Sequence, residues 1–520
     1  MGMVAPQQRI ASAYFVVFGK YGDVSRYAEE RGVCRQWVYR EADWLRNCLA
    51  TSREKIDALE QQVRELDQQK AALEHRLTLS VELDEEKQAQ LAAVGQANGV
   101  SLPVVWLFLD VLISGKQLSV ASLGRRTKAL GKKSGELLAV LDEFARARAR
   151  QAAADELYVN DPVRMVVEQE SLCWLSGQLS AAVDGEGWAQ EFRQLPNLEQ
   201  LARDGGTALA KGVALVNAER QEQGRSLLVD QGDHFHALHG ASGGFRKAQR
   251  QAATALDGAE KAEKELAECK KQGQHANAAS GNARTAWRKA EEAMDDWSEL
   301  DEAWSKTKQA LRLVTPEGDL NTRQRAEAQL AQTLPRLPDA DFAKTKRQIQ
   351  KPEMLNYLDH VQRQIEALPF TEEVKQAAVR QECLRRQPEV LNGEGKRAAA
   401  LRGVMLVCAV VLAKTENVGQ QAVAAIRDIF RRAYRASSLV ECINSAVRMH
   451  QCRHRKMTQG LLDLKRLYWN CHTFRTGRRR GTMPYGRLGI PWPEGMRWWD
   501  VLKLTPEQLR DKLSTAKMPP

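Results

Sequence analysis

The fold of this chain is decided by the stretch LEQLARDGGT, residues 198–207. Residues 198–202 have the composition of a strand, Asp204-Gly205-Gly206 suits a turn, and residues 207–220 have the pattern of a helix. Further extended runs lie at 156–159, 163–167, 172–175, 226–229 and 235–238. Strands that alternate with helices predict a mixed α/β sheet between about residues 155 and 239.

Helical patterns occupy most of the remaining chain. Residues 245–434 predict an all-helical insertion that begins with two long charged helices joined near 273–281. Residues 102–150 predict three helices, at 102–113, 119–130 and 134–150, with turns at Gly115 and Gly131. Their basic residues suit phosphate contacts: Arg125, Arg126, Lys128, Lys132 and Lys133.

The length of 520 residues implies several domains, because single cores rarely grow beyond about 250 to 300 residues. The fold class that we expect is mainly α with an α/β core. We expect these parts: 1–50, a helix-turn-helix domain; 51–95, a coiled coil; 96–150, a second helix-turn-helix-like domain; 151–243, the first part of the α/β domain; 244–430, the helical insertion; 431–485, the last part of the α/β domain; and 486–520, a tail in which Trp492, Trp498 and Trp499 look exposed.

Residues 23–40 resemble a bacterial helix-turn-helix, with Ala28 at the tight crossing and Gly32 in the turn. Four polar side chains would then lie on the exposed side of a recognition helix, where they can reach base edges: Arg35, Gln36, Tyr39 and Arg40. A plain three-helix core is the alternative. We favour DNA binding.

A heptad pattern follows, with residues spaced alternately three and four apart. The positions are Ile56, Leu59, Val63, Leu66, Lys70, Leu73 and Leu77. Lys70 at an a-type position would weaken such a seam but help to fix its register. We favour a homodimer through this helix over an intramolecular hairpin.

Charge and composition point to an anionic partner. The formal net charge is +11, and residues 442–480 contain ten Lys or Arg against one acid, Asp463. A basic excess of this kind favours nucleic acid. The apolar run 404–413 is about half of the roughly 20 residues that a membrane crossing needs, so we expect a buried helix and no membrane partner.

The scattered cysteines and the N-terminal sequence predict a reducing, cytoplasmic location. Nine cysteines form no C-x-x-C pair, and the first residues lack the apolar core of a secretory signal. The chain also lacks the phosphate-binding loop of nucleotide hydrolases and the G-x-S-x-G elbow of esterases. Neither His234-x-His236-x-x-His239 nor His450-x-Cys452-x-His454 has a recognisable zinc spacing.

Three acids are candidates for a metal-dependent site. Asp155 stands before a predicted strand, Asp204 at the end of another, and Glu441 on a predicted helix. Carboxylates from separate elements can hold the two divalent cations that cut a phosphodiester most readily. Ser438-x-x-Glu441 also fits a capping box, which would make Glu441 purely structural. Asp204 before two glycines also fits an ordinary turn or helix cap.

The order of several motifs along the chain is similar to that of bacterial insertion-sequence transposases of the DDE class. The motifs are Asp155-Glu156-Leu157-Tyr158-Val159, Leu201-Ala202-Arg203-Asp204-Gly205-Gly206-Thr207, Asp233-His234-Phe235-His236, Ser437-Ser438-x-x-Glu441-x-x-Asn444-Ser445, and the tail from Asn470-Cys471-His472 to Leu488-Gly489. The similarity spans roughly residues 150–245 and 400–515.

The resemblance implies a ribonuclease H-like catalytic domain that is interrupted by the helical insertion. Asp155, Asp204 and Glu441 would be the catalytic triad and would bind two Mg²⁺ ions, for which Mn²⁺ can substitute. The activity implied is cleavage and strand transfer at the terminal repeats of a mobile element. The partners implied are the terminal repeats and target DNA, both double-stranded, bound by a homodimer or higher oligomer on the bacterial nucleoid.

The resemblance also assigns residues around the triad. Glu156 or Glu168 is the alternative to Asp155 as first ligand, and His236 either orients the site or is a packed core histidine. Asn444 and Arg448 share the helix face of Glu441. The residues expected to contact DNA near the cut are Asn444, Arg448, Arg453, Arg455, Lys456, Arg478, Arg479 and Arg480. The competing function is a noncatalytic DNA-binding protein, either a decayed transposase or a coiled-coil regulator.

Overall fold

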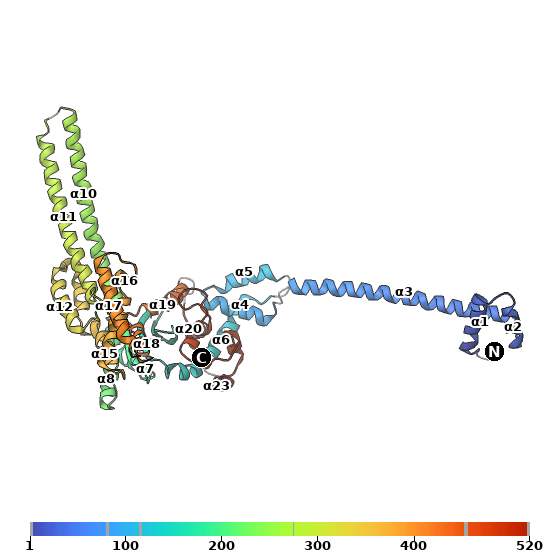
Figure 1. Ribbon diagram of the computed structural model, residues 1–520. Helices are drawn as coiled ribbons and strands as arrows, with labels where there is room; N and C mark the ends of the chain where they lie inside the picture. Colours follow the sequence, from blue (N-terminus) through green and yellow to red (C-terminus); the bar gives the residue numbers. More distant parts are fainter. Residues whose placement is uncertain are drawn as a thin grey trace. The chain divides into compact units, whose positions relative to one another are not determined.

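The structure is a computed structural model that describes residues 4–79, 83–113, 117–273, 275–415, 417–451 and 456–516 (Figure 1). The chain divides into two compact units, residues 1–84 and residues 85–520. Most of the chain is helical, and the strands form one sheet in the second unit. This confirms the expectation of a mainly α chain with a mixed sheet.

The first unit consists of α1 (Pro6–Phe18), α2 (Asp23–Glu30) and α3 (Arg35–Leu79). Tyr27, Ala28 and Val38 form its small core, and Gly32 makes the turn between α2 and α3 with a positive φ of 64°. The three expected helices are present. The third continues past residue 50, where the helix-turn-helix domain was expected to end, because no Gly or Pro interrupts residues 35–79. The recognition helix and the heptad pattern therefore belong to one helix.

The heptad side chains lie along an exposed face of α3. Ile56, Leu59, Val63, Leu66 and Leu73 are each 55 to 63% exposed. Lys70 is 4.0 Å from Glu74 one turn further on. The Leu77 side chain lies outside the described part.

The second unit is built on a five-stranded sheet in the order β3-β2-β1-β4-β5. Its strands are β1 (Gln151–Tyr158), β2 (Pro162–Glu168), β3 (Trp174–Leu179), β4 (Gln200–Arg203) and β5 (Val229–Gly232). β1, β2 and β3 form an antiparallel meander, and β4 and β5 run parallel to β1.

Two strand predictions are corrected. β1 begins at Gln151, so Asp155 lies within the strand and not before it. Residues 235–238 are not a strand, because Asp233 caps α9 (His234–Gly240) by accepting from the N–H groups of Phe235 and His236. The short apolar run there fits either structure in sequence, and the cap decides for the helix.

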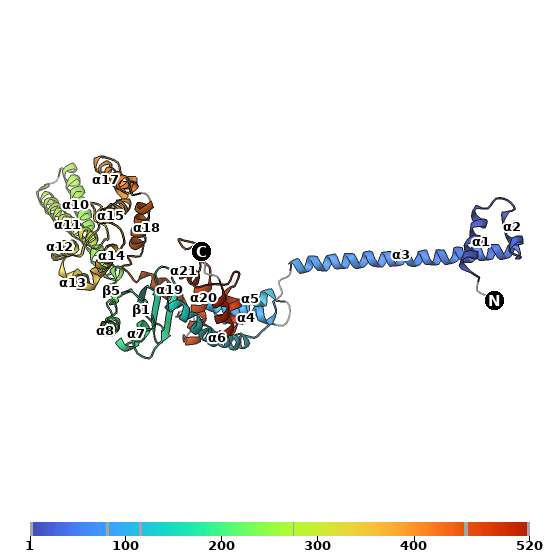
Figure 2. The ribbon, with the colours of Figure 1, turned by 60° about the horizontal axis from the view of Figure 1, so that its bottom comes forward.

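Helices cover both faces of the sheet (Figure 2). Ala152, Ala154 and Leu201 point to one face, where α7 (Gly185–Arg193) and α8 (Thr207–Glu222) pack. Ala153, Leu157 and Ala202 point to the other face, where they meet α19 (Ser438–Gln451). This alternation follows from the two-residue period of a strand. It places odd-numbered residues of β1 and even-numbered residues of β4 under α19.

Both edges of the sheet are closed by hydrogen bonds from other elements. At β3, α20 (Gln459–Cys471) supplies Asn470, whose Oδ1 accepts from the Trp174 N–H at 2.8 Å, and Gln459, whose Nε2 donates to Gly177 O at 2.9 Å. At β5, Asn356 donates to Asp230 O at 2.5 Å. Asn356 opens α14 (Asn356–Glu366), which belongs to the insertion. Unpaired strand edges invite association with other chains, and these contacts remove that hazard.

The helical region before the sheet differs from the prediction. It contains α4 (Glu85–Ala97), α5 (Leu102–Leu112) and α6 (Val120–Arg146), and α6 runs through Gly131 without a break. The expected turn at Gly131 is therefore wrong, while Gly115 lies outside the described residues. Gly131 serves a close crossing with α20, because a Cβ built on it would lie 2.6 Å from the carbonyl oxygen of Gly460.

We expect Gly131→Ala to destabilise the protein by about 1 to 3 kcal/mol, because the added methyl must push the α20 backbone away. Gly258 in α10 (Ser242–Lys271) has nothing within 4 Å of a built Cβ. There the same change should stabilise by up to about 1 kcal/mol through helix propensity. Urea denaturation of both variants measures the two signs. A stabilising effect at Gly131 would contradict the tight crossing.

The insertion begins with α10 and α11 (Asn277–Ala310), which lie side by side as an antiparallel pair (Figure 1). This confirms the predicted pair of long helices. The following elements are α12 (Arg323–Thr333), η1 (Leu334–Arg336), α13 (Asp339–Ile349), η2 (Pro352–Leu355), α14, α15 (Glu372–Arg385), α16 (Pro388–Asn392), α17 (Lys396–Ala413) and α18 (Asn417–Arg431). A separate apolar core holds them together.

Two burial predictions are wrong. The apolar run 404–413 lies in α17, but Leu406, Val407 and Val410 are 50 to 66% exposed, so the helix is only partly buried. The C-terminal α21 (Pro484–Arg487), α22 (Trp498–Lys503) and α23 (Pro506–Thr515) end the described chain. Trp499 there is buried, and Trp492 and Trp498 pack against the same core.

None of the described helices has the length and apolarity to cross a membrane.

Candidate active site

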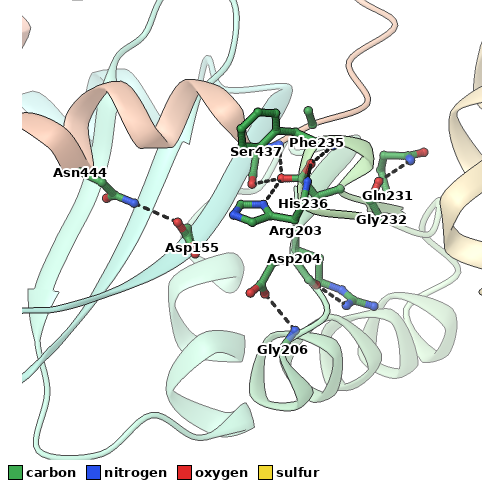
Figure 3. A network of polar contacts seen from close by, with 12 residues as sticks. Asp155, Arg203, Asp204, Gly206, Gln231, Gly232, Phe235, His236, Ser437 and Asn444 are labelled. Atoms are coloured by element: carbon green, nitrogen blue, oxygen red, sulfur yellow. Dashed lines mark hydrogen bonds and ion pairs between the residues drawn. The ribbon is translucent and has the colours of Figure 1, made fainter. Parts of the chain in front are cut away.

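The strand register brings Asp155 and Asp204 together. Gln151 of β1 pairs with Gln200 of β4, and this parallel pairing continues to Ala154 and Arg203. Asp155 is the next residue of β1, and Asp204 is the first residue after β4. Neighbouring strands lie only about 4.8 Å apart, so the two acids stand beside each other where β4 ends. Figure 3 shows both side chains on the face beneath α19.

Asp155 is almost fully buried. Its exposed fraction is 7%, Oδ2 accepts from Asn444 Nδ2 at 2.9 Å, and Oδ1 accepts from the Glu156 N–H at 2.8 Å. Burial raises the pKa of Asp155 to about 6, and the negative charges of Asp204 and Glu441 add to this rise. Asp155 is therefore harder to ionise here than in water, chiefly because it is buried.

Glu441 comes from the helix that covers the acid pair. Val440, Ile443 and Val447 pack on the sheet, which fixes the face of α19 that carries Asn444. The carboxylate of Glu441 accepts from Arg448 Nη1 at 2.8 Å, two turns along α19. This contact differs from the capping box expected as the alternative. Within the described residues, no three His, Cys, Asp or Glu side chains lie close enough to form a metal-binding group.

Asp233 connects the sheet to α19. Its carboxylate accepts from the His236 ring Nδ1 at 2.7 Å, from the Ser437 N–H at 2.9 Å and from the Ser437 hydroxyl. Burial acts to raise the pKa of Asp233, but the hydrogen bonds from His236 and Ser437 outweigh it and leave the pKa below its usual value. Asp233 thus holds the start of α19 at the end of β5.

His236 belongs to the polar site and is only half-buried, so the expectation of a packed core histidine is wrong. Its hydrogen bond with Asp233 raises the pKa of His236 to about 9, with smaller contributions from the charges of Asp155 and Asp204. The imidazole is therefore protonated at neutral pH. Figure 3 shows it beside the acid pair.

Glu156 and Glu168 do not join the acid pair. Glu156 follows Asp155 on β1 and therefore points to the opposite face, where its Oε1 accepts from Trp188 Nε1 at 3.1 Å. Glu168 pairs in register with Ala152, near the other end of the strand, and its carboxylate accepts from Ser171. Of the three candidate first ligands, only Asp155 faces Asp204.

The basic run of residues 442–480 divides into structural and exposed parts. Arg466 is buried, pairs with Asp142 and donates to Trp174 O at 2.9 Å, and Lys465 donates to Ala97 O at 2.7 Å. Arg479 reaches the carbonyl of Glu170 at 3.3 Å. These three side chains support the fold. Of the three, only Arg479 was expected to bind DNA, and its hydrogen bonds go to the backbone of Gln169 and Glu170.

The remaining predicted DNA-binding residues are exposed where they are described. On α3 these are Arg35, Gln36, Tyr39 and Arg40, and in the C-terminal part of the chain they are Arg448, Lys456, Arg478 and Arg480. Asn444 is the exception, because it is fully buried against Asp155. Arg453 and Arg455, with Cys452 and His454 of the histidine-cysteine pattern, lie outside the described residues.

Sequence reasoning missed two residues of this site. Asp233 was visible in the motif before Phe235 and His236, and its place as a helix cap was the available signal. Lys351 comes from the insertion and lines a small cavity together with Asp204 and His236. A Cβ built on Gly205 would lie 3.7 Å from Lys351 Nζ. No local pattern signals this approach, because it depends on how the insertion folds back.

Comparison of the chain with protein-family models, curated proteins and solved structures finds no match in any of the three.

We expect Asp155→Asn to stabilise the protein above about pH 6. The pKa of this buried acid is raised from 3.8 to about 6, so stability is lost as pH rises through that interval and the folded state is forced to ionise. The neutral amide avoids this cost, and the gain should be roughly 2 to 3 kcal/mol at most. Urea denaturation at about pH 4 and pH 7.5 tests it. Glu156→Gln is the matched control, and an equal gain there would contradict the assignment.

His236 gives the opposite dependence. Its pKa is raised from 6.5 to about 9, so the stability that it contributes is complete below pH 6.5 and disappears as pH rises through 9. The difference in melting temperature between wild type and His236→Gln should shrink over that range. His239→Gln changes an exposed histidine of the same helix and serves as control. A difference for His236→Gln that stays constant with pH would refute the charged pair with Asp233.

Proposed function

We propose that this chain is a DDE-type DNA transposase, which cleaves DNA at the ends of a mobile element and transfers the strand. The observation that carries the proposal is the pairing of Asp155 and Asp204 under a helix that supplies Glu441. The strand order and directions are also those expected of a ribonuclease H-like domain. The motif order along the sequence supports the same family.

The residues at the acid pair suit a hard divalent cation. Asp155 and Asp204 offer carboxylate oxygens, and the Oδ1 atom of Asn444 is buried beside Asp155 with no hydrogen-bond partner. Mg²⁺ and Mn²⁺ prefer oxygen ligands. Burial is the main reason for the raised pKa of Asp155, and the charges of Asp204 and Glu441, which add to it, are charges that a cation would offset. When bound, such ions supply activation of the attacking oxygen and stabilisation of the leaving one. Asp155 and Asp204 would hold them. Glu441 would join only after its carboxylate leaves Arg448, because the three acids do not form a metal-binding group in the described structure.

The other residues position these acids. Asn444 fixes the Asp155 carboxylate, and Asp233 fixes both His236 and the start of α19. Arg448 holds Glu441 in a contact that is about half-exposed on the arginine side, so it can be exchanged at little cost. In this proposal the exposed cations near α19 neutralise the phosphates of the bound strand.

The first unit would recognise the element. Arg35, Gln36, Tyr39 and Arg40 are exposed at the start of α3, as recognition through the major groove requires. The apolar face of α3 would pair with the same face of a second copy, since a heptad seam buries its side chains against another helix. This arrangement would hold two element ends together.

A noncatalytic DNA-binding protein is the second candidate. The observation that favours it is the contact between Glu441 and Arg448, together with the lack of a three-residue metal-binding group in the described part of the chain. A decayed transposase would keep the exposed cations and α3, and would bind DNA without cutting it.

Metal-dependent nicking separates the two functions. The substrate is duplex DNA that carries the sequences flanking the coding region, incubated with the full chain and Mg²⁺ or Mn²⁺. We expect the wild type to nick it and Asp204→Asn to lose at least about 100-fold in rate, because one of the paired carboxylates is gone. Glu156→Gln makes the same change on the opposite face and should stay active. Equal nicking by wild type and Asp204→Asn would remove the acid pair from catalysis, and binding without nicking by the wild type would favour the second candidate.

A further inference from the structure

A basic cavity lies behind the link between Asp233 and Ser437. Its volume is about 480 Å³, and it lies between α9, the last turns of α11 and the segment that leads into α19. Its charged lining residues are Lys308, Arg312 and Arg435, and none of the residues that line it is an acid. His234 also lines the cavity and is neutral at pH 7, because burial lowers its pKa to about 4.

Two of these cations have no anionic partner in the described structure. Arg435 is held in the wall of the cavity, because its Nη1 donates to Leu311 O at 2.8 Å. Lys308 lies 6.0 Å from the centre of the Trp304 ring, and neither Lys308 nor Arg312 forms an ion pair with any described acid. Arg312 is exposed and Lys308 is half-buried. Unlike Arg435, they are therefore available to an external anion.

A second cavity is lined by both arginines and glutamates, and it differs in this from the basic cavity. It is lined by Arg148, Arg150, Arg432 and Arg487, but Glu168, Glu170 and Glu199 line it as well. Arg150 lies 2.6 Å from Glu199, and Arg432 lies 3.3 Å from Glu170. Two of those four arginines are thus paired with acids that line the same cavity. None of the residues that line the basic cavity is an acid.

The basic cavity and the acid pair are connected through adjacent residues. His234 lines the basic cavity, while Asp233 and His236 line the small cavity beside Asp204. Ser438 and Leu439 line the basic cavity and lie within one turn of Glu441 on α19. The first N–H groups of this helix add a partial positive charge on the same side. A strand held at the acid pair could thus place a neighbouring phosphate in the cavity.

We propose that Lys308 and Arg312 bind a backbone phosphate of the DNA strand that lies at the acid pair. The inference rests on the proposed DNA-processing function and adds a role for the insertion, because both residues come from its second long helix or the turn after it. The cavity volume of about 480 Å³ leaves room for a phosphate group. The contact would position the strand and not read its sequence.

The test measures DNA affinity as a function of salt, without divalent metal. Each phosphate contact contributes about 0.9 to the slope of log K against log salt on duplex DNA, so the double variant Lys308→Gln/Arg312→Gln should lower the slope by about 1 to 2. The control Lys306→Gln/Arg336→Gln removes the same charge from the insertion, at two residues that both pair with Glu302. We expect its slope to match that of the wild type.

A second variant separates charge from folding. Lys308→Arg/Arg312→Lys keeps both cations and should keep the wild-type slope, while the melting temperatures of all variants show whether they fold. An unchanged slope in a folded Lys308→Gln/Arg312→Gln protein would overturn the proposal, as would an equal drop in the control. Failure of the proposed function looks different: the wild type itself would then bind DNA without metal-dependent nicking, whatever the slopes of the variants.

Discussion

The carboxylate of Asp233 is the constraint on which the rest of the second unit depends. It accepts hydrogen bonds from α9 just after β5 and from Ser437, which lies 204 residues later. The backbone adds a contact at the same place, where the His234 N–H donates to Arg435 O at 2.9 Å. Because α19 begins at Ser438, directly after Ser437, these hydrogen bonds fix the positions of Asn444 and Glu441 above the sheet. A buried carboxylate that is saturated with donors stabilises strongly and tolerates little displacement.

The electrostatics of the site follow from this placement. The helix lowers Asn444 onto Asp155, which removes the acid from water while Asp204 and Glu441 remain near enough to repel it. The positive charge of His236 offsets part of that repulsion. The Nδ1 atom of His236, however, is hydrogen-bonded to Asp233 and not to Asp155 or Asp204. The acids of the site thus lie together at the end of β4, whereas Lys308, Arg312 and Arg435 line the cavity that His234 also lines. Acids therefore line the cavity at Asp233 and His236, and cations line the cavity at His234.

Much of the local structure was predictable from the sequence, and the tertiary placement was not. Gly32, the stretch around Asp204 and the two long charged helices carry local signals, and each was located correctly. Residues 235–238 were misread because a short apolar run has no period of its own, and the Asp233 cap decides its structure. Gly131 looked like a turn, but close helix packing explains it. The pairing of Asp155 with Asp204 needs the parallel register, and the burial of Arg466 needs Asp142; neither is written in local sequence.

The hydrogen bond between the His234 N–H and Arg435 O also bears on how such a chain can grow. The insertion leaves the α/β domain after His234 and returns to it at Arg435, and these two residues are in contact. The insertion can therefore be longer or shorter without shifting the register of any strand. One helix of the insertion is constrained by the sheet, because Asn356 at the start of α14 donates to Asp230 O of the edge strand β5. A chain without the insertion would need another group to cover this edge of the sheet, so the first turn of α14 serves the sheet as well as the insertion.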